Sequence, residues 1–293
     1  MNAPLQSAIE KSISNATGEH FSIQRTQASS GGCIHDSRII SDGSQSYFIK
    51  INALSSAPMF ASEAAGLAAL ESAQCIRTPQ VVAHGNGGAS AFLLLEALEL
   101  TGSRRAGDWA MLGASLAKLH RKTHTQFGFQ TDNFIGATPQ YNQWRDDWVD
   151  FFCDQRLVPQ FRLAESKGFH FKSATLLIEK TEQLLGRHHP EPSLLHGDLW
   201  SGNVGFLRDG TPVIFDPAVY YGDRETDLAF SKLFGGFPAS FYAAYQDEFP
   251  LQDGFEQRKN LYNLYHILNH LNLFGGSYAM QAEQMLGKLL SNS

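Results

Sequence analysis

Three polar residues in the second half of the chain have the spacing of a phosphoryl-transfer site. Asn203 follows Asp198 after five positions, and Asp216 comes 18 residues after Asp198, behind the strand-like run from Pro212 to Phe215. A carboxylate at the first position can receive the proton of a substrate hydroxyl, whereas an amide and a second carboxylate are suitable Mg²⁺ ligands. The pattern therefore predicts Asp198 as the base and Asn203 and Asp216 as metal ligands.

A lysine and a glutamate near the N-terminus have the order expected of a nucleotide clamp. Lys50 lies in the strand-like run from Tyr47 to Ile51, and Glu63 lies early on the helix expected next. The ammonium neutralises phosphate charge, and the carboxylate holds the flexible lysine stem in one geometry. Alone, Lys50 would be interpreted as a solvated charge on a strand. Together with the downstream loop, it is predicted to bind phosphate with Glu63 as its partner.

A glycine pair precedes this lysine. Gly31 and Gly32 can bring backbone N–H groups close to phosphates because no Cβ intervenes, although the pair is not a full G-x-G-x-x-G motif and also fits a plain hairpin turn. The neighbouring Cys33 is interpreted as a small packed thiol. The alternative is a redox-sensitive thiol in the nucleotide loop, because exposure and electropositive surroundings favour the thiolate.

Aromatic, acidic and imidazole side chains surround the predicted base. Trp200, Tyr220 and Tyr221 are candidates for a substrate wall because aromatic faces stack on sugar C–H surfaces; the alternative is that they pack the lobe interior. We expect His196 to lock the catalytic loop through backbone contacts. Asp227 is interpreted as a buried brace that accepts backbone N–H bonds from this loop, rather than as a third metal ligand.

The elements that position these residues begin with a small N-terminal lobe. Apolar runs separated by Gly-rich turns predict five strands, at 21–26, 37–40, 47–51, 80–85 and 91–95. Apolar residues recurring every three or four positions predict a helix at 58–74, and a short amphipathic helix is expected at 3–15. We expect a nucleotide-binding lobe over residues 1–95 and a hinge at 96–102, whose backbone around Glu96 and Leu98 meets adenine.

Beyond the hinge the apolar pattern has a helical period. Helices are expected at 106–123, 142–166, 172–187, 226–234, 238–248, 255–274 and 277–291. The predicted fold class is α+β and two-lobed, like that of protein kinases. A five-stranded antiparallel sheet with a helix forms one lobe, and a mainly helical second lobe over 103–293 carries the catalytic and metal-binding loops and the substrate pocket.

The composition is that of a globular enzyme. The chain has 293 residues, of which 43% are hydrophobic, and this length suffices for two cores. The net charge of −6 argues against a nucleic-acid or anionic-membrane partner, which would call for a basic surface. We find neither a secretory signal nor an apolar run of bilayer length, so we expect a cytoplasmic protein, a monomer or weak dimer.

Cysteine and histidine spacings indicate no second metal site. The three cysteines are odd in number and widely separated, which is typical of reduced thiols. Two pairs of histidines are four residues apart, but no HExxH motif or nearby cysteine accompanies them, so we interpret them as packed lobe residues. These pairs are His120 with His124 and His266 with His270.

Longer segments around these residues resemble the fructosamine kinase family, also called ketosamine 3-kinases, within the aminoglycoside phosphotransferase-like kinases. The segments are SGGCI (30–34), FIKIN (48–52), DNFIG (132–136), LHGDLWSGN (195–203), DPAVYYGDRE (216–225), LFGGF (233–237) and LYNLYHILNHLNLFG (261–275). An isolated HGDxxxxN motif is shared by many small-molecule kinases. The combination of HGDLWSGN with DPAVYYGDRE is far more specific.

The resemblance implies a two-lobed kinase fold, ATP with Mg²⁺, and phosphorylation of the 3-hydroxyl of a ketoamine, the product of sugar glycation of a small amine or a protein. Phosphorylation would make the ketoamine unstable and release the amine, which is a deglycation. The roles carried over are Asp198 as base, Asn203 and Asp216 as metal ligands, Lys50 at the α- and β-phosphates, Glu63 as its partner, and Trp200 beside the sugar.

Two alternatives remain open. One is another small-molecule kinase, for aminoglycosides, choline or an amino alcohol; a polycationic drug would need an acidic pocket, and residues 275–293 contain only Glu283 as an acid. The other is a nucleotide-binding regulator without catalysis. The intact set of Lys50, Asp198, Asn203 and Asp216 argues against the regulator.

Overall fold

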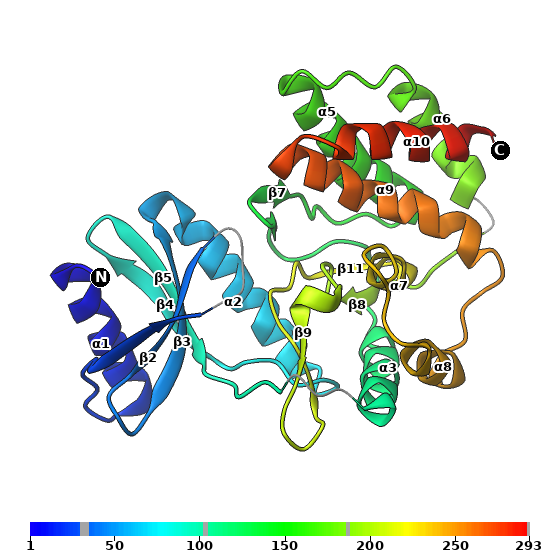
Figure 1. The fold of residues 1–293 in the computed structure, drawn as a ribbon. Coiled ribbons are helices and arrows are strands. Elements are labelled where there is room, and N and C mark those ends of the chain that lie inside the picture. The colour runs from blue at the N-terminus through cyan, green and yellow to red at the C-terminus, as the bar shows by residue number, and fades with distance from the viewer. Residues whose placement is uncertain (30–34, 102–104, 186–187, 292–293) are drawn as a thin grey trace.

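The protein has a lobe built on a β-sheet and a larger helical lobe (Figure 1). The structure is a computed structural model that describes residues 1–29, 35–101, 105–185 and 188–291. The predicted glycine pair Gly31-Gly32 and Cys33 lie outside these residues. No helix in the described ranges is both long and apolar enough to cross a membrane.

Five antiparallel strands form the N-terminal sheet in the order β1-β2-β3-β5-β4. They are β1 (Arg25–Ala28), β2 (Asp36–Ser41), β3 (Ser46–Ala53), β4 (Val81–Gly87) and β5 (Ser90–Glu96). The prediction of five strands is confirmed, but the first begins at residue 25 and not at 21. Phe21 is buried under a helix, and its N–H donates to the Ser14 hydroxyl at 3.1 Å, so it is not available to a strand ladder.

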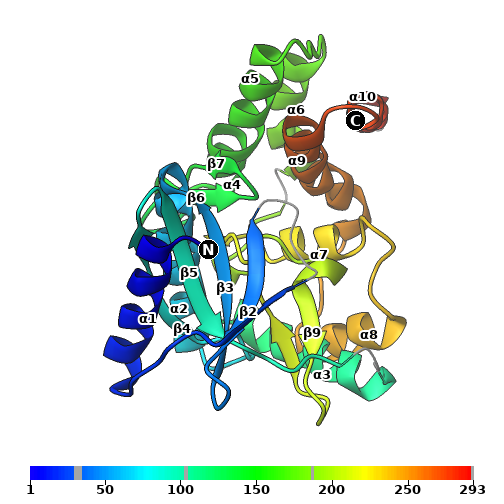
Figure 2. The same ribbon diagram turned by 60° about the vertical axis from the view of Figure 1, so that its left-hand side comes forward.

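Two helices cover opposite faces of this sheet, as Figures 1 and 2 show: α1 (Ala3–Thr17) and α2 (Ala57–Ser72), the latter after a short 3₁₀ turn at Leu54–Ser56. Alternate residues of β5 point to opposite faces. Phe92 and Leu94 therefore pack with α1, whereas Leu93 and Leu95 pack with α2. The two central strands β3 and β5 are therefore buried on both sides, whereas the edge strand β1 is exposed.

The same alternation positions Lys50. Its neighbours Ile49 and Ile51 pack into the cluster under α1, so the Lys50 side chain must project toward α2. Glu63 lies on α2 and is bonded to this lysine. A register shift of one residue would turn Lys50 away from Glu63.

Besides a 3₁₀ turn at Ser201–Asn203, nine α- or π-helical segments in the described part of the chain make up the second lobe. They are α3 (Ala106–His120), α4 (Trp148–Phe152), a π-helical turn (Cys153–Leu157), α5 (Val158–Ser166), α6 (Ala174–Leu185), α7 (Glu225–Ser231), α8 (Ala239–Glu248), α9 (Phe255–Phe274) and α10 (Tyr278–Ser291). The predicted helix at 142–166 instead begins at Trp148. Asp147 caps its first turn by accepting N–H bonds from Val149 and Asp150, and Arg145 before it pairs with Phe127 in a β-bridge.

Three small antiparallel ladders hold the loops of this lobe: β6 (Asn133–Ile135) with β7 (Thr138–Gln140), β8 (Ser193–Leu195) with β11 (Tyr220–Gly222), and β9 (Val204–Phe206) with β10 (Pro212–Ile214). The sequence analysis recognised only the strand near 212–215. The loop from 196 to 203 runs between β8 and β9, and Asp216 follows β10. These ladders therefore fix both ends of the segments that carry the predicted base and metal ligands.

One tight contact sets the distance between α3 and α8. A Cβ built on Gly113 would lie 2.1 Å from the carbonyl oxygen of Phe241, which is backbone and cannot rotate away. We expect Gly113→Ala to destabilise the protein by about 1–3 kcal/mol through forced separation of the helices. Denaturant unfolding measures this change.

Gly107 supplies the matched control on the same helix, because a Cβ there meets nothing within 4 Å. Gly107→Ala should leave stability unchanged or raise it by up to about 1 kcal/mol, as usual for alanine in a helix. Equal unfolding midpoints for the two variants would contradict the close packing of α3 on α8.

Candidate active site

Asp198 and Asn203 face each other across the loop between β8 and β9. Nδ2 of Asn203 donates to Oδ2 of Asp198 at 2.9 Å and to its backbone carbonyl at 2.8 Å. The 3₁₀ turn Ser201–Asn203 brings the two residues into this position. Because the amide nitrogen is used by Asp198, the amide oxygen of Asn203 is the atom left to bind a cation.

His196 and Asp227 hold this loop from below. Asp227, on α7, accepts the backbone N–H groups of His196 at 2.8 Å and Gly197 at 2.9 Å. Burial opposes the charge of Asp227, but the hydrogen bonds from His120 and Gly197 outweigh it and lower its pKa. Asp227 thus has the position expected of the predicted brace.

The imidazole of His196 is bonded at both nitrogens. Its Nε2–H donates to the Phe215 carbonyl at 3.0 Å, which leaves Nδ1 to accept the N–H of Asp198 at 3.2 Å. Burial lowers the pKa of His196, so the ring is neutral and this tautomer is retained. One side chain thereby ties the backbone of the base to the segment that precedes Asp216.

Gly197 is required by a close approach in the same loop. Its φ is +81°, and a Cβ there would lie 2.0 Å from the carbonyl oxygen of Ala218. Asp216 is itself held at a φ of +58°, which is uncommon for a residue with a side chain. Asp198, which follows Gly197, and Asp216 are therefore both positioned by left-handed backbone conformations that the surrounding ladders impose.

Lys50 joins the two lobes. Its Nζ lies 2.7 Å from Oε1 of Glu63 and 2.6 Å from Oδ1 of Asp216. Burial alone would lower the pKa of Lys50, but the charges of Glu63 and Asp216 more than compensate and raise it. The ammonium stays charged, as binding to phosphate requires.

Asp198 has an environment suited to proton transfer. Burial raises the pKa of its carboxyl to about 7, against the opposing hydrogen bond from Asn203. A carboxylate that titrates near neutrality accepts a hydroxyl proton more readily than an ordinary surface aspartate, because its proton affinity is higher. The geometry therefore supports Asp198 as a base.

One cleft contains these residues. Of the predicted site residues it is lined by Lys50, Glu63, Asp198, Trp200, Asn203 and Asp216. It also contains residues to which the sequence analysis assigned no role, among them His35, Asn133, Phe134, Asn269 and Phe274, and it contains His270, which was interpreted as a packed lobe residue. Most of these residues lie in segments 132–136 and 261–275, which the family resemblance had already singled out. Nothing in the sequence pointed to His35.

The structure corrects the predicted position of two tyrosines. Tyr220 is only 3% exposed, and its ring stacks on the Phe151 ring while the guanidinium of Arg156 packs against both rings. Tyr221 packs on His124 and Trp144. Neither lines the cleft: both lie on β11, which pairs with β8, and their rings are taken up by these contacts within the lobe.

The two residues expected to meet adenine, Glu96 and Leu98, form hydrogen bonds within the protein. The carboxylate of Glu96 pairs with Arg77, and the Glu96 N–H donates to the Gln80 carbonyl at 2.9 Å. The carbonyl of Leu98 accepts the N–H of Leu100 at 3.1 Å. A role of Glu96 and Leu98 in adenine binding stays a prediction.

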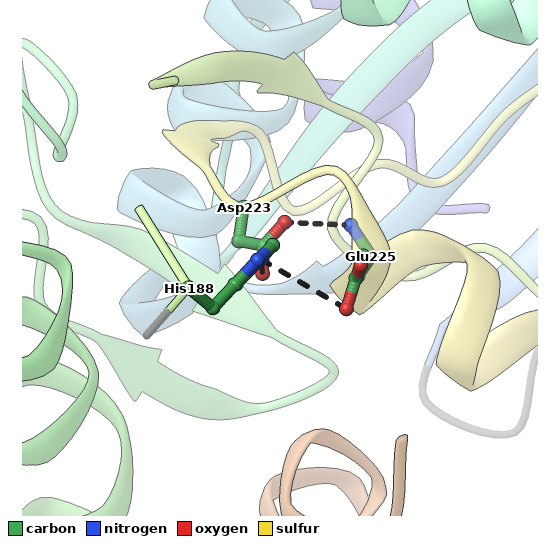
Figure 3. Close-up of side chains that lie close together, drawn as sticks. All are labelled: His188, Asp223 and Glu225. Carbon is green, nitrogen blue, oxygen red and sulfur yellow. Dashed lines mark hydrogen bonds and ion pairs between the residues drawn. The ribbon is translucent and has the colours of Figure 1, made fainter. Parts of the chain in front are cut away.

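A second acidic cluster lies behind the site. His188, Asp223 and Glu225 are close enough to hold a metal (Figure 3). However, His188 donates to Asp223 at 2.7 Å, Tyr262 also donates to Asp223, and Arg258 forms a bidentate pair with Glu225 at 2.7 Å. We interpret the cluster as an ion-pair network that fixes α7 to α9.

The donor set at Asn203 and Asp216 fits Mg²⁺. Both offer oxygen, and Asp216 uses Oδ1 for Lys50, which leaves Oδ2 for a cation. Three carboxylates and one ammonium line this end of the cleft, so the local charge is negative and attracts a divalent ion. The residues present therefore accommodate the metal that the spacing predicted.

The fold and this site define a kinase-like protein. At 15% identity, a thermostable mutant of an aminoglycoside phosphotransferase superposes with a TM-score of 0.62 and covers 97% of this chain and 98% of its own. A choline kinase from Streptococcus pneumoniae, at 14% identity, has a TM-score of 0.63 and covers 98% and 99%. These two likenesses concern the fold alone.

The chain belongs to the fructosamine kinase family, whose family model matches residues 5–292. It is 50% identical to the "Probable ketoamine kinase" of Synechocystis sp., over 98% of this chain and 97% of that protein. It is 39% identical to the chloroplastic protein-ribulosamine 3-kinase of Arabidopsis thaliana, over 93% and 85%. A crystal structure from Haemophilus somnus 129PT, provisionally named a fructosamine-3-kinase, has 32% identity and a TM-score of 0.93 and covers 98% of both chains. The resemblance and the predicted fold class are confirmed.

Replacement of Asp227 should damage the catalytic loop. In Asp227→Asn one acceptor becomes an NH₂ group that faces an N–H donor, so we expect a loss of about 1–3 kcal/mol of stability. Displacement of the loop should lower kcat about 10²-fold. Asp247→Asn, an exposed change on α8, is the control; wild-type kcat in the Asp227 variant would contradict the bracing role.

The ion-pair network should make stability depend on pH. Burial lowers the pKa of His188, but its hydrogen bond to Asp223 and the charges of Asp223 and Glu225 outweigh this and raise it. A raised pKa stabilises the fold below the unfolded value of about 6.5, and this contribution is lost as pH rises through the folded pKa. We therefore expect thermal unfolding scans from pH 6 to 9 to show a fall in Tm that is smaller in His188→Gln. Parallel curves would contradict this role.

Proposed function

We propose that the protein is an ATP-dependent ketosamine 3-kinase, which phosphorylates the sugar 3-hydroxyl of a glycated amine. This proposal is carried by one observation: Asp198, Asn203 and the Lys50–Asp216 ion pair line the same cleft. The arrangement suits phosphoryl transfer to a hydroxyl. The substrate class is supported by family membership and by relatives named ketoamine kinase and protein-ribulosamine 3-kinase.

Binding uses both lobes. Lys50 would contact the α- and β-phosphates while Glu63 holds its stem, and the glycine pair Gly31-Gly32 would cover the phosphates. Asn203 and Asp216 would hold Mg²⁺, which offsets charge on the transferred phosphoryl group. We propose residues 1–95 as the nucleotide-binding lobe, 96–102 as the hinge, whose backbone at Glu96 and Leu98 contacts adenine, and 103–293 as the catalytic lobe.

Asp198 performs the proton transfer. Its Oδ2 is held by Asn203, so the carboxylate has a fixed direction toward the cleft. The substrate hydroxyl binds to this carboxylate and gives up its proton as its oxygen bonds to the γ-phosphorus and the bond to the ADP oxygen breaks. Positioning and charge supply most of the barrier reduction. Trp200 lies at the rim of the cleft and is proposed to contact the sugar.

The product explains the proposed biological role. Phosphorylation at the 3-hydroxyl makes the ketoamine unstable, and its breakdown frees the original amine, which amounts to deglycation of a small amine or a protein. We propose that this takes place in the cytoplasm and that the enzyme is a monomer or weak dimer.

Asp198→Ala should abolish turnover but preserve nucleotide binding, because the base contacts the acceptor and not ATP. We expect turnover to fall by about 10²–10⁴-fold. A coupled assay of ADP formation measures the loss of turnover, and calorimetry with MgATP measures nucleotide binding. Asp209→Ala, in an exposed turn, is the control. Activity of Asp198→Ala above a tenth of wild type would rule out the assignment.

A substrate panel tests the reaction itself. ATP turnover should be seen with ketoamines derived from hexoses, pentoses or tetroses and not with aminoglycosides or choline. Turnover of the latter compounds alone would identify another small-molecule kinase. Binding of MgATP without turnover of any acceptor would identify a nucleotide-binding regulator.

A further inference from the structure

We propose that the C-terminal turn of α9, through His270 and Phe274, binds the amine-bearing arm of the substrate and makes the enzyme select ketoamines whose arm is apolar and lacks a carboxylate beside the amine. This inference rests on the proposed ketosamine 3-kinase function and names the part of the substrate that the site discriminates.

The cleft has a closed polar end and an open aromatic end. Asn133 and Asn269 line it and are 5% and 2% exposed, so they form its closed end. Trp200 and Phe274 also line it, but they are 36% and 54% exposed. Both amides are already hydrogen-bonded within the lobe, so they wall off this end, whereas an exposed aromatic rim suits a chain that must reach solvent.

The aromatic rim is a continuous row. Trp200 meets Phe234 with ring centroids 6.3 Å apart, and Phe234 meets His270 at 5.0 Å. His270 in turn meets Phe274 at 5.7 Å, one helical turn further along α9. The row therefore extends from the catalytic loop to the mouth of the cleft, and an exposed Phe at its end is apolar surface with room for a ligand.

His270 offers a directed acceptor within this row. Its Nδ1 lies 2.8 Å from the carbonyl oxygen of His266, which can only accept, so Nδ1 carries the proton. Burial lowers the pKa of His270, and the ring is therefore neutral near pH 7. Nε2 of this cleft-lining residue is then left as a hydrogen-bond acceptor, and it carries no positive charge to repel an ammonium group.

The chemistry of a ketoamine places its amine near this row. Four bonds separate the 3-hydroxyl oxygen from the amine nitrogen, a distance of at most about 5 Å at ordinary bond lengths. With the hydroxyl at Asp198, the secondary ammonium must lie within the cleft, and the arm beyond it must leave by the open end. Aromatic faces and the Nε2 acceptor both favour an ammonium group and the carbon atoms attached to it.

The negative charge of the cleft accounts for the proposed selection against a carboxylate beside the amine. Glu63, Asp198 and Asp216 line the cleft, and the ammonium of Lys50 is already bonded to two of them. A carboxylate two bonds from the amine would enter this negative field. Ketoamines of free α-amino acids should therefore bind more weakly than those of side-chain amines or amides.

The experiment uses the full-length enzyme with MgATP and ketoamines that share one sugar but differ in the amine: methylamine, phenethylamine, glycine and glycinamide. We expect Phe274→Ala to raise KM for the phenethylamine compound about tenfold, with kcat changed less than twofold and a smaller effect on the methylamine compound. Met280→Ala is the control, since Met280 is more exposed, at 63%, but does not line the cleft. It should leave every KM unchanged.

His270→Phe keeps the ring and removes the acceptor, so it should raise KM for all four compounds. Wild-type enzyme should prefer glycinamide over glycine ketoamine about tenfold at low salt, and the ratio should shrink as salt is added. If Phe274→Ala raises KM equally for the methylamine and phenethylamine compounds, or if His270→Phe leaves KM unchanged, the assignment of the arm to α9 is wrong. If no ketoamine is phosphorylated by the wild type, the proposed function fails instead.

Discussion

The contact on which this structure depends is the bond from Lys50 to Asp216, which joins residues 166 positions apart at 2.6 Å. Its two partners come from different lobes, and each is positioned by its own local constraint. The pleat of β3 projects Lys50 toward α2. The ladder of β9 and β10 and a left-handed backbone at Asp216 bring the carboxylate from the other side. The cleft exists where these two constraints meet.

A single buried carboxylate, that of Asp227, fixes the position of the catalytic loop. Asp227 satisfies two consecutive backbone N–H groups that no strand or helix pairs, and those groups belong to the residues just before the base. Buried backbone donors without a partner are costly, so the loop is stable only in the conformation that reaches Asp227. His196 adds a link to the Phe215 carbonyl, and the positions of the two aspartates are thus coupled through one ring.

Much of this fold was predictable from local sequence patterns. Helix α9 has the predicted bounds, and apolar residues recur at helical spacing along it from Leu261 to Phe274. The sequence pattern gave the wrong bounds where a tertiary contact determines the structure. Phe21 was predicted to start a strand but packs under α1. Residues 142–147 were predicted to be helical but are held extended by the bridge to Phe127.

Within the site, the motif spacing found the polar residues, because a reaction restricts their types. It misplaced Tyr220 and Tyr221, since the face that a short strand presents follows from its pairing with β8, which the sequence does not show. Phe274 lies in a segment that the family resemblance covers, but no spacing marked it, and His35 had no signal at all. They line the cleft because the start of β2 and the end of α9 meet there in space.

Trp200 has a consequence for how this protein is observed. Of the four tryptophans, Trp109 and Trp148 are buried at 6% and 3% exposure, and Trp144 is stacked on His124 with ring centroids 4.4 Å apart. Trp200 alone among them lines the cleft. The intrinsic fluorescence of the protein therefore comes from three tryptophans that lie away from the cleft and one that lines it, so a ligand that enters the cleft should change the emission of Trp200 without any label.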